Sequence, residues 1–241
     1  MPAVRSFLRS AHWPALAAAF AGVDELLFIS GSEVGKRIAQ HRAVIAAAKQ
    51  ASVNLIVYTS LLRADRARMS LAAEHVATER ALAESGVPFV LLRNGWYTEN
   101  YTENLGAALE HGVLLGAAKS GRIAAASRAD YAAAAAAVLT GEGHVGKVYE
   151  LAGDQAFTLA DLAAEVAHQS GKPVVYNDLP GVDYANALKG FGVPAPVAEM
   201  LASADEGIAR GELDVADGDL RRLIGRPTTP LAVSVAAALQ R

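Results

Sequence analysis

Residues 54–60 read Asn-Leu-Ile-Val-Tyr-Thr-Ser, a short apolar run that ends in hydroxyl side chains. Similar apolar runs lie at residues 25–30 and 88–93, and a stretch with helical spacing follows each of the first two. Short apolar runs that alternate with helices are typical of parallel strands covered on both faces. The sequence therefore predicts an α/β fold with a doubly wound parallel sheet.

Caps and periodicity predict the remaining elements. We expect helices at about residues 33–51, 70–85, 97–111 and 129–139, and further strands at 147–151 and 173–176. The first helix should bury one face, formed by Ile38, Val44, Ile45 and Ala48. Gly86 is the expected stop of the second helix. Thr158 with Asp161 has the spacing of a helix N-cap, residues 190–196 predict a loop, and residues 4–8 are a weaker strand candidate.

Composition bounds the possible functions. The chain has 241 residues, of which 52% are hydrophobic and 20% charged, so a single packed domain is expected. A formal net charge of −3 gives no electrostatic argument for nucleic acid or for an anionic membrane. Because the sequence has no cysteine, it forms no disulfide or thiolate metal site, and a cytoplasmic location is expected. No apolar run reaches the ~18–20 residues that span a bilayer, and no metal site is predicted.

Polar clusters follow three of the predicted strands, at residues 30–35, 58–60 and 93–100. Parallel strands open a crevice at their carboxyl ends, where ligands bind in doubly wound folds. The third cluster combines aromatic, amide, carboxylate and arginine side chains, which can stack on a flat ring and hydrogen-bond its polar groups. An ordinary strand-to-helix turn with capping residues is the competing interpretation of the same composition.

Four ordered motifs point to a known family. They are LLFISGSEVGKRIAQHRAVIAAAK from residue 26, VYTSLLRAD from 57, AEHVATERAL from 73 and VPFVLLRNGWYTENY from 87, with LIGRPTTPL near the C-terminus. Together they resemble the NmrA-like branch of the short-chain dehydrogenase/reductase superfamily, and within it the type 2 NAD(P)H:quinone oxidoreductases. The resemblance runs from about Pro14 to Leu239, and NGWYTEN is its most specific segment.

The resemblance implies a set of site residues. The cofactor would be NADPH or NADH and the substrate a small-molecule quinone, with His75 and Tyr97 as candidate catalytic residues. Relatives place the NGWYxEN segment at the nicotinamide and quinone site and a basic residue near the position of Arg128. Positions that match the family's cofactor-binding segments are Ser30, Gly31, Ser32, Tyr58, Thr59, Ser60, Asn94, Gly95, Trp96, Tyr97, Glu99, Asn100 and Arg128.

The sequence departs from the family in two places. Leu71 stands where many superfamily members have the tyrosine of a Tyr-x-x-x-Lys pair, which argues against alcohol oxidation because that reaction needs a base at this position. The glycine-rich GxxGxxG motif that follows the family's first strand is absent. We therefore expect an incomplete Rossmann-like sheet that lacks central strands, leaving an unpaired edge and inviting association into a homo-oligomer.

The expected organisation is one NAD(P)-binding-type domain over residues 1–241. Its Rossmann core would cover about 1–150, and a small C-terminal α+β substrate subdomain would use about 94–125 and 151–241. The resemblance implies hydride transfer from NAD(P)H to a quinone, impaired to the extent that the missing phosphate-binding loop weakens cofactor binding. Two alternatives remain: a non-catalytic, NmrA-type dinucleotide or redox-sensing regulator, and a non-functional fragment.

Overall fold

A computed structural model describes residues 13–33, 35–215 and 217–240. Its main sheet has four parallel strands in the order β1-β2-β3-β5. The predicted parallel α/β sheet is confirmed. Val4–Leu8, the weak strand candidate, lies outside the described residues. The strands are β1 (Glu25–Phe28), β2 (Leu55–Leu61), β3 (Phe89–Asn94) and β5 (Val148–Leu151).

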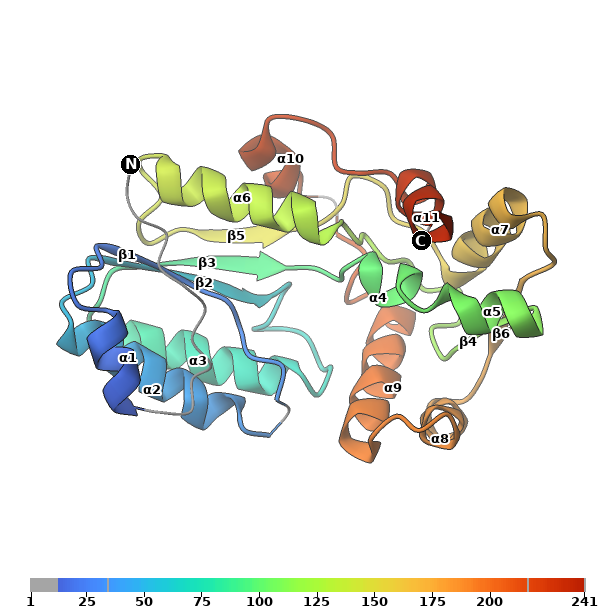
Figure 1. The fold of residues 1–241 in the computed structure, drawn as a ribbon, viewed down its shortest axis with the longest axis horizontal. Helices are drawn as coiled ribbons and strands as arrows, with labels where there is room; N and C mark the ends of the chain where they lie inside the picture. Colours follow the sequence, from blue (N-terminus) through green and yellow to red (C-terminus); the bar gives the residue numbers. More distant parts are fainter. Residues whose placement is uncertain (1–12, 34, 216, 241) are drawn as a thin grey trace.

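Helices cover both faces of this sheet (Figure 1). On one face α1, α2 and α3 pack against apolar side chains that include Phe28, Ile56 and Leu91. On the other face α6 and α10 pack against alternate residues of the same strands, such as Val57 and Leu92. The covering helices are α1 (Trp13–Ala19), α2 (Arg37–Gln50), α3 (Ala72–Ser85), α6 (Arg128–Thr140) and α10 (Asp219–Ile224).

A second group of elements lies beyond the carboxyl ends of the main strands (Figure 1). It contains a second sheet of two parallel strands, β4 and β6. Its core joins Leu105, Leu162 and Ile208 with Trp96, which enters from the end of β3. The elements are β4 (Val113–Gly116), β6 (Val175–Asp178), α4 (Glu99–Thr102), α5 (Leu105–His111), α7 (Leu159–Ser170), α8 (Gly181–Gly190), α9 (Ala195–Ala209) and α11 (Leu231–Leu239).

Most predicted elements are present, with shifted ends. Gly86 terminates α3 in the left-handed conformation, with φ of 76°, as predicted. Thr158 forms a capping box with Asp161 at the start of α7, also as predicted. The predicted helix at 97–111 is instead two helices, α4 and α5, which are separated at Asn104. The predicted loop at 190–196 is shorter, because α9 begins at Ala195.

The expectation that central strands are missing from within this sheet is wrong for the described residues. β2 pairs directly with β1 on one side and with β3 on the other, and β3 pairs with β5. The unpaired edge that the sequence predicted is instead the outer edge of β1, which has no second neighbour among the described strands. In the described part of the chain, no helix is long and apolar enough to cross a membrane.

Candidate functional site

The polar clusters after β1, β2 and β3 meet at one edge of the sheet. The strand register aligns Phe28 with Tyr58, Tyr58 with Leu91, and Asn94 with Leu151. The backbone N–H of Ser30 donates to Oγ1 of Thr59 at 2.9 Å, which joins the first two clusters directly. The prediction that these segments lie together is therefore confirmed, and the edge is where a parallel sheet can receive a ligand.

Four of the predicted site residues gather where β3 leads into α4. The guanidinium carbon of Arg128 lies 5.4 Å from the centre of the Tyr97 ring, within the range of a cation–π contact. Arg128 also pairs with Glu103 at 2.5 Å and stays half exposed. Glu99 accepts two hydrogen bonds from the backbone N–H of Arg128, at 2.9 and 3.0 Å, at the N-terminus of α6. Asn100 completes the group with an Oδ1 that lies 3.5 Å from Nη2 of Arg128.

Asn94 and Gly95 form a tightly packed turn at the end of β3. Gly95 donates its N–H to the carbonyl of Leu151 at 2.8 Å. A Cβ atom at Gly95 would lie 3.0 Å from the Tyr131 hydroxyl and 3.1 Å from the Leu151 carbonyl, so a larger residue does not fit there without a shift. Oδ1 of Asn94 is buried and has no hydrogen-bond partner among the described residues. An orphaned acceptor beside the strand ends is a candidate ligand contact.

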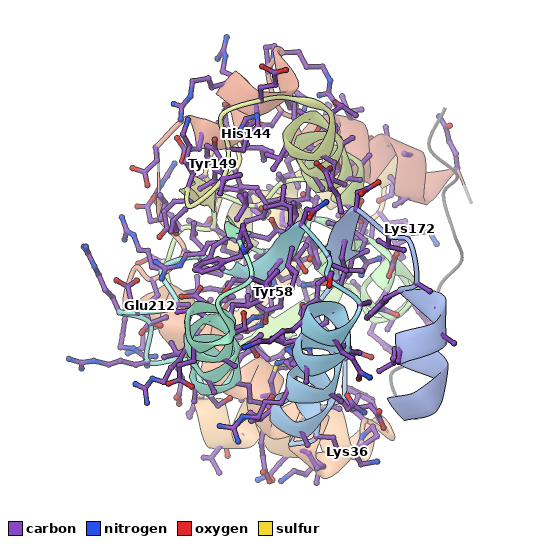
Figure 2. The ribbon with its side chains drawn as sticks, turned by 90° about the vertical axis from the view of Figure 1, so that its left-hand side faces the viewer. Lys36, Tyr58, His144, Tyr149, Lys172 and Glu212 are labelled. Atoms are coloured by element: carbon purple, nitrogen blue, oxygen red, sulfur yellow. The ribbon has the colours of Figure 1, made fainter. Side chains whose placement is uncertain are left out.

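Three other predicted site residues lie in the interior. Tyr58 is fully buried between the sheet and helices α2 and α3, whereas Lys36 lies at the outer surface (Figure 2). The Tyr58 hydroxyl is 2.9 Å from Nδ1 of His75, which is also buried. Trp96 is buried in the core of the second group of elements, beyond the carboxyl ends of the main strands. These buried side chains therefore pack beneath the strand-end edge and are not accessible to a ligand.

Burial decides the protonation of the Tyr58–His75 pair. Desolvation, reinforced by the nearby charge of Arg37, lowers the pKa of His75 to about 3. Desolvation also raises the pKa of Tyr58 above its ordinary value. At neutral pH both side chains are uncharged, so His75, a candidate catalytic residue, carries no imidazolium proton.

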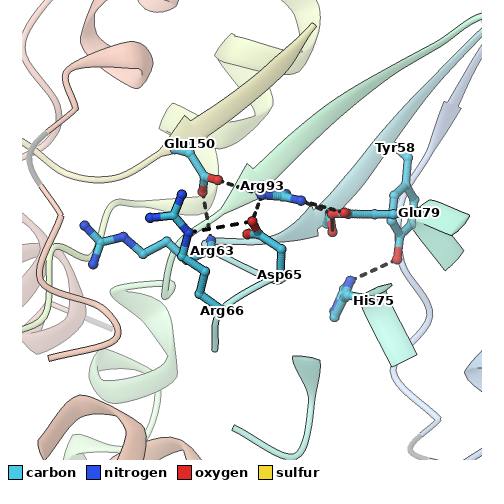
Figure 3. A network of polar contacts seen from close by, with 9 residues as sticks. Tyr58, Arg63, Asp65, Arg66, His75, Glu79, Arg93 and Glu150 are labelled. Carbon is cyan, nitrogen blue, oxygen red and sulfur yellow. Dashed lines mark hydrogen bonds and ion pairs between the residues drawn. The ribbon is translucent and has the colours of Figure 1, made fainter. Parts of the chain in front are cut away.

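Arg93 binds acidic side chains from several segments at this edge, so its guanidinium is not free to bind a ligand (Figure 3). Its guanidinium makes bidentate hydrogen bonds to Glu79, at 2.7 and 3.0 Å. It also contacts Asp65 at 2.8 Å and Glu150 at 2.9 Å. Burial alone would lower the pKa of Arg93, but the hydrogen bonds that it donates to Glu79 and Glu150 outweigh burial and raise the pKa. Ser60, a predicted cofactor residue, donates to Glu79 at 2.5 Å and so belongs to this network.

Sequence reasoning missed three residues that hold the loop after β1. Nε of Arg37 donates to the Gly31 carbonyl at 2.7 Å, and Nη1 of Arg37 pairs with Glu74 at 3.1 Å. Nε2 of His41 accepts the N–H of Gly31 at 3.0 Å. Arg37 and His41 are one turn apart on the buried face of α2, which they share with Val44. Polar residues on the apolar face of a predicted helix were the available signal, because burial demands partners for them.

A buried carboxylate fastens the C-terminal segment beside this site. Asp130, in the first turn of α6, pairs with Arg226 at 2.7 Å and accepts the N–H of Thr229 at 2.8 Å. It also accepts the hydroxyl of Ser127 at 2.9 Å. Burial alone would raise the pKa of Asp130, but these hydrogen bonds outweigh it and lower the pKa. The segment LIGRPTTPL thus places Arg226 and Thr229 against the first turn of α6, next to the strand ends.

The family model that describes the NmrA-like family matches residues 11–217. The chain belongs to the NmrA-like family. It is 58% identical to quinone oxidoreductase 2 of Escherichia coli K12 over 221 residues, which are 92% of this chain and 77% of that protein. The predicted resemblance is confirmed at this level.

Two solved structures are similar to this chain over nearly its whole length. The NADPH complex of the E. coli NADPH-dependent quinone oxidoreductase matches with a TM-score of 0.93 and 55% identity, over 96% of this chain and 82% of that one. The NADP(H) complex of a Citrobacter sp. triphenylmethane reductase matches with a TM-score of 0.90 and 39% identity, over 95% of this chain and 82% of that one. The Rossmann-like fold class is therefore shared with structures that bind this type of cofactor.

Proposed function

We propose that this chain belongs to an NADPH-dependent reductase that transfers hydride to quinones. The observation that carries the proposal is the 58% identity to E. coli quinone oxidoreductase 2, which extends over 92% of the chain. The non-catalytic regulator that the sequence left open is less well supported, because no feature of the strand-end edge favours it over a reductase.

The residues present fit the nicotinamide end of the cofactor. Oδ1 of Asn94, which is buried and has no partner in the described part of the chain, is an acceptor suited to an amide N–H, and Tyr97 offers a partly exposed ring beside it. Ser30, Gly31 and Ser32 line the same edge from the end of β1. The sequence has no glycine-rich loop, so we assign no residue to the pyrophosphate.

The chain's own residues supply position and charge. The cofactor, when bound, supplies the hydride. Tyr97 can stack on a flat quinone ring, and Arg128, whose guanidinium carbon lies 5.4 Å from the centre of the Tyr97 ring, places a cation beside that position. Reduction of a quinone by hydride and one proton gives a hydroquinone, and negative charge develops on the quinone oxygens on the way. A guanidinium near those oxygens stabilises that charge.

Tyr97 can also hold a proton at the site. Nδ2 of Asn94 lies 3.5 Å from the Tyr97 hydroxyl oxygen and can only donate, so that oxygen is the acceptor in this weak contact. The hydroxyl proton of Tyr97 is therefore available to the substrate. His75 does not compete for this role, because its imidazole is buried and uncharged at neutral pH.

The test is steady-state oxidation of NADPH, followed by absorbance, with 1,4-benzoquinone as the acceptor. We expect quinone-dependent turnover, and we expect Arg128→Ala to lower kcat/KM for the quinone by about tenfold as one charge contact is lost. Glu142→Ala, an exposed position after α6, is the matched control and should change nothing. NADPH binding without turnover would favour the regulator instead, and a chain that neither binds nor melts cooperatively would favour the fragment.

A further inference from the structure

Side chains from three elements hydrogen-bond to backbone atoms of the loop between β1 and α2. Ser30 N–H donates to Thr59 of β2, and Gly31 N–H donates to His41 of α2. The Gly31 carbonyl accepts from Arg37, and the N–H of Gly35 donates to Glu74 of α3 at 3.1 Å. The N–H and the carbonyl of Gly31 thus point into the protein, and side chains of α2 fix the conformation of this residue.

The hydrogen bonds around His41 have one consistent direction. Because the N–H of Gly31 can only donate, Nε2 of His41 must carry the lone pair. Nδ1 then carries the proton and donates to Oγ1 of Thr78 at 2.9 Å. The Thr78 hydroxyl donates in turn to the carbonyl of Glu74 at 2.9 Å. The chain of donors therefore ends on a backbone acceptor and specifies the Nδ1–H tautomer.

Aromatic packing fixes the plane of the His41 ring. The Phe28 ring meets it edge-on, with centroids 4.7 Å apart, and the Tyr58 ring meets it edge-on at 5.6 Å. Only 2% of the His41 surface is exposed, so the imidazole has no room to rotate away from the loop. A ring packed against two aromatic side chains and hydrogen-bonded through both nitrogens is a rigid support.

We propose that His41 is a positioning residue, which in its Nδ1–H tautomer anchors Gly31 and keeps residues 30–32 in the shape that receives the dinucleotide. This inference rests on the proposed function. The competing explanation is that His41 is a satisfied core histidine with no effect on the ligand. His75 separates the two explanations, because it is equally buried in the same layer but contacts Tyr58 and not the loop.

The first measurement needs no cofactor. ¹⁵N NMR of the imidazole should show a protonated Nδ1 and an unprotonated Nε2 at His41, and hydrogen exchange at the Gly31 amide should be slow. In His41→Leu, which removes the acceptor, exchange at that amide should accelerate, whereas His75→Leu should leave it unchanged. A protonated Nε2 at His41, or equal exchange at Gly31 in both variants, overturns the proposal.

The second measurement is kinetic. We expect His41→Leu to raise the KM for NADPH about tenfold with kcat changed by less than about threefold. The variant keeps the residues that act on the quinone but loses the hydrogen bond that holds the loop at Gly31. His41→Gln, which restores an acceptor, should recover most of that loss, and His75→Leu should leave the KM unchanged although it also lowers the Tm. Equal KM changes in His41→Leu and His75→Leu overturn the proposal. Absence of NADPH turnover by the unmodified chain would overturn the proposed function, and the NMR result would still decide the contact.

Discussion

At the scale of single residues, Tyr97 is the side chain whose chemistry the structure defines best. Tyr97→Phe keeps the ring and its contact with Arg128 but loses the hydroxyl. We expect kcat/KM for a quinone to fall less than about tenfold, because solvent can protonate the reduced oxygens, and an obligatory general acid would cost about 10²–10⁴-fold. Tyr97→Ala should fall further, because it also loses the ring. A hundredfold loss in Tyr97→Phe would show that the hydroxyl is an essential acid.

Alanine substitutions at two glycines near the strand ends should differ in their effect on stability. A Cβ at Gly95 meets the Tyr131 hydroxyl and the Leu151 carbonyl at 3.0 and 3.1 Å, so Gly95→Ala should lower the free energy of unfolding by about 1–3 kcal/mol. A Cβ at Gly31 comes no closer than 3.4 Å to the side chain of Gln40, so Gly31→Ala should be nearly neutral. Urea denaturation measures both, and equal losses would contradict the packing argument.

The sequence was enough to predict which segments lie at the strand ends, but not the direction in which their side chains point. It located the segments that hold Ser30, Thr59 and Asn94, because carboxyl ends of parallel strands converge whatever the side chains are. It could not tell that Tyr58 turns inward, because strand residues alternate between faces and both faces of β2 are buried. The partners of buried polar groups such as Arg93 come from distant elements, which a linear pattern does not pair.

At the scale of elements, burial on both faces explains which predictions succeeded. β2 is buried along its whole length, so its continuous apolar run identified it. β4 is only four residues long and ends in Gly116, and nothing in its sequence distinguishes it from a loop. The α2 helix begins at Arg37, later than the expected start near 33, and the N–H of Gly35 just before it donates to Glu74 of α3.

The contact between α6 and the C-terminal segment gives a prediction at this scale. Asp130→Asn removes the charge that pairs with Arg226 and weakens the acceptor for Thr229. We expect a loss of about 2–3 kcal/mol in the free energy of unfolding, measured with urea, because the partners of a fully buried carboxylate are left uncompensated. Asp214→Asn is the control: its pair with Arg122 is about half exposed and 4.0 Å long, so its loss should be within about 0.5 kcal/mol. Equal losses would refute the importance of burial here.

At the scale of the whole molecule, buried histidines couple folding to pH. The pKa of His41 is lowered to about 4 and that of His75 to about 3, in both cases by burial first and by the charge of Arg37 second. A histidine whose folded pKa is depressed stabilises the fold above its unfolded value of about 6.5, and that stability is lost as pH falls toward the folded pKa. Tyr58 contacts both imidazoles, the charge of Arg37 acts on both, and Glu74 pairs with Arg37.

Asp205 opposes this trend in the same pH range. Burial raises its pKa to about 6, so the folded state holds a proton there that the unfolded state lacks, and this contribution favours folding as pH falls from 6 to about 4. We expect the Tm to be flat above about pH 7 and to fall below about pH 6.5, because two histidines outweigh one carboxyl. His75→Gln should flatten the fall and Asp205→Asn should steepen it. A Tm that rises on acidification to pH 5 would contradict this balance.

The proposed cofactor site leads to a prediction at the scale of the whole chain. The residues that we propose for the ligand lie at the nicotinamide end, and the sequence has no glycine-rich loop for the pyrophosphate. NADPH should therefore bind only about as tightly as reduced nicotinamide mononucleotide, with Kd values within about tenfold, and adenosine 2′,5′-bisphosphate should bind weakly. Thermal unfolding measures this, since a ligand at about a hundred times its Kd adds about 2.7 kcal/mol to the free energy of unfolding. Because hydride transfer needs only the nicotinamide, the mononucleotide should also support quinone reduction. NADPH that binds a hundredfold more tightly than the mononucleotide would show that other residues of this chain hold the pyrophosphate.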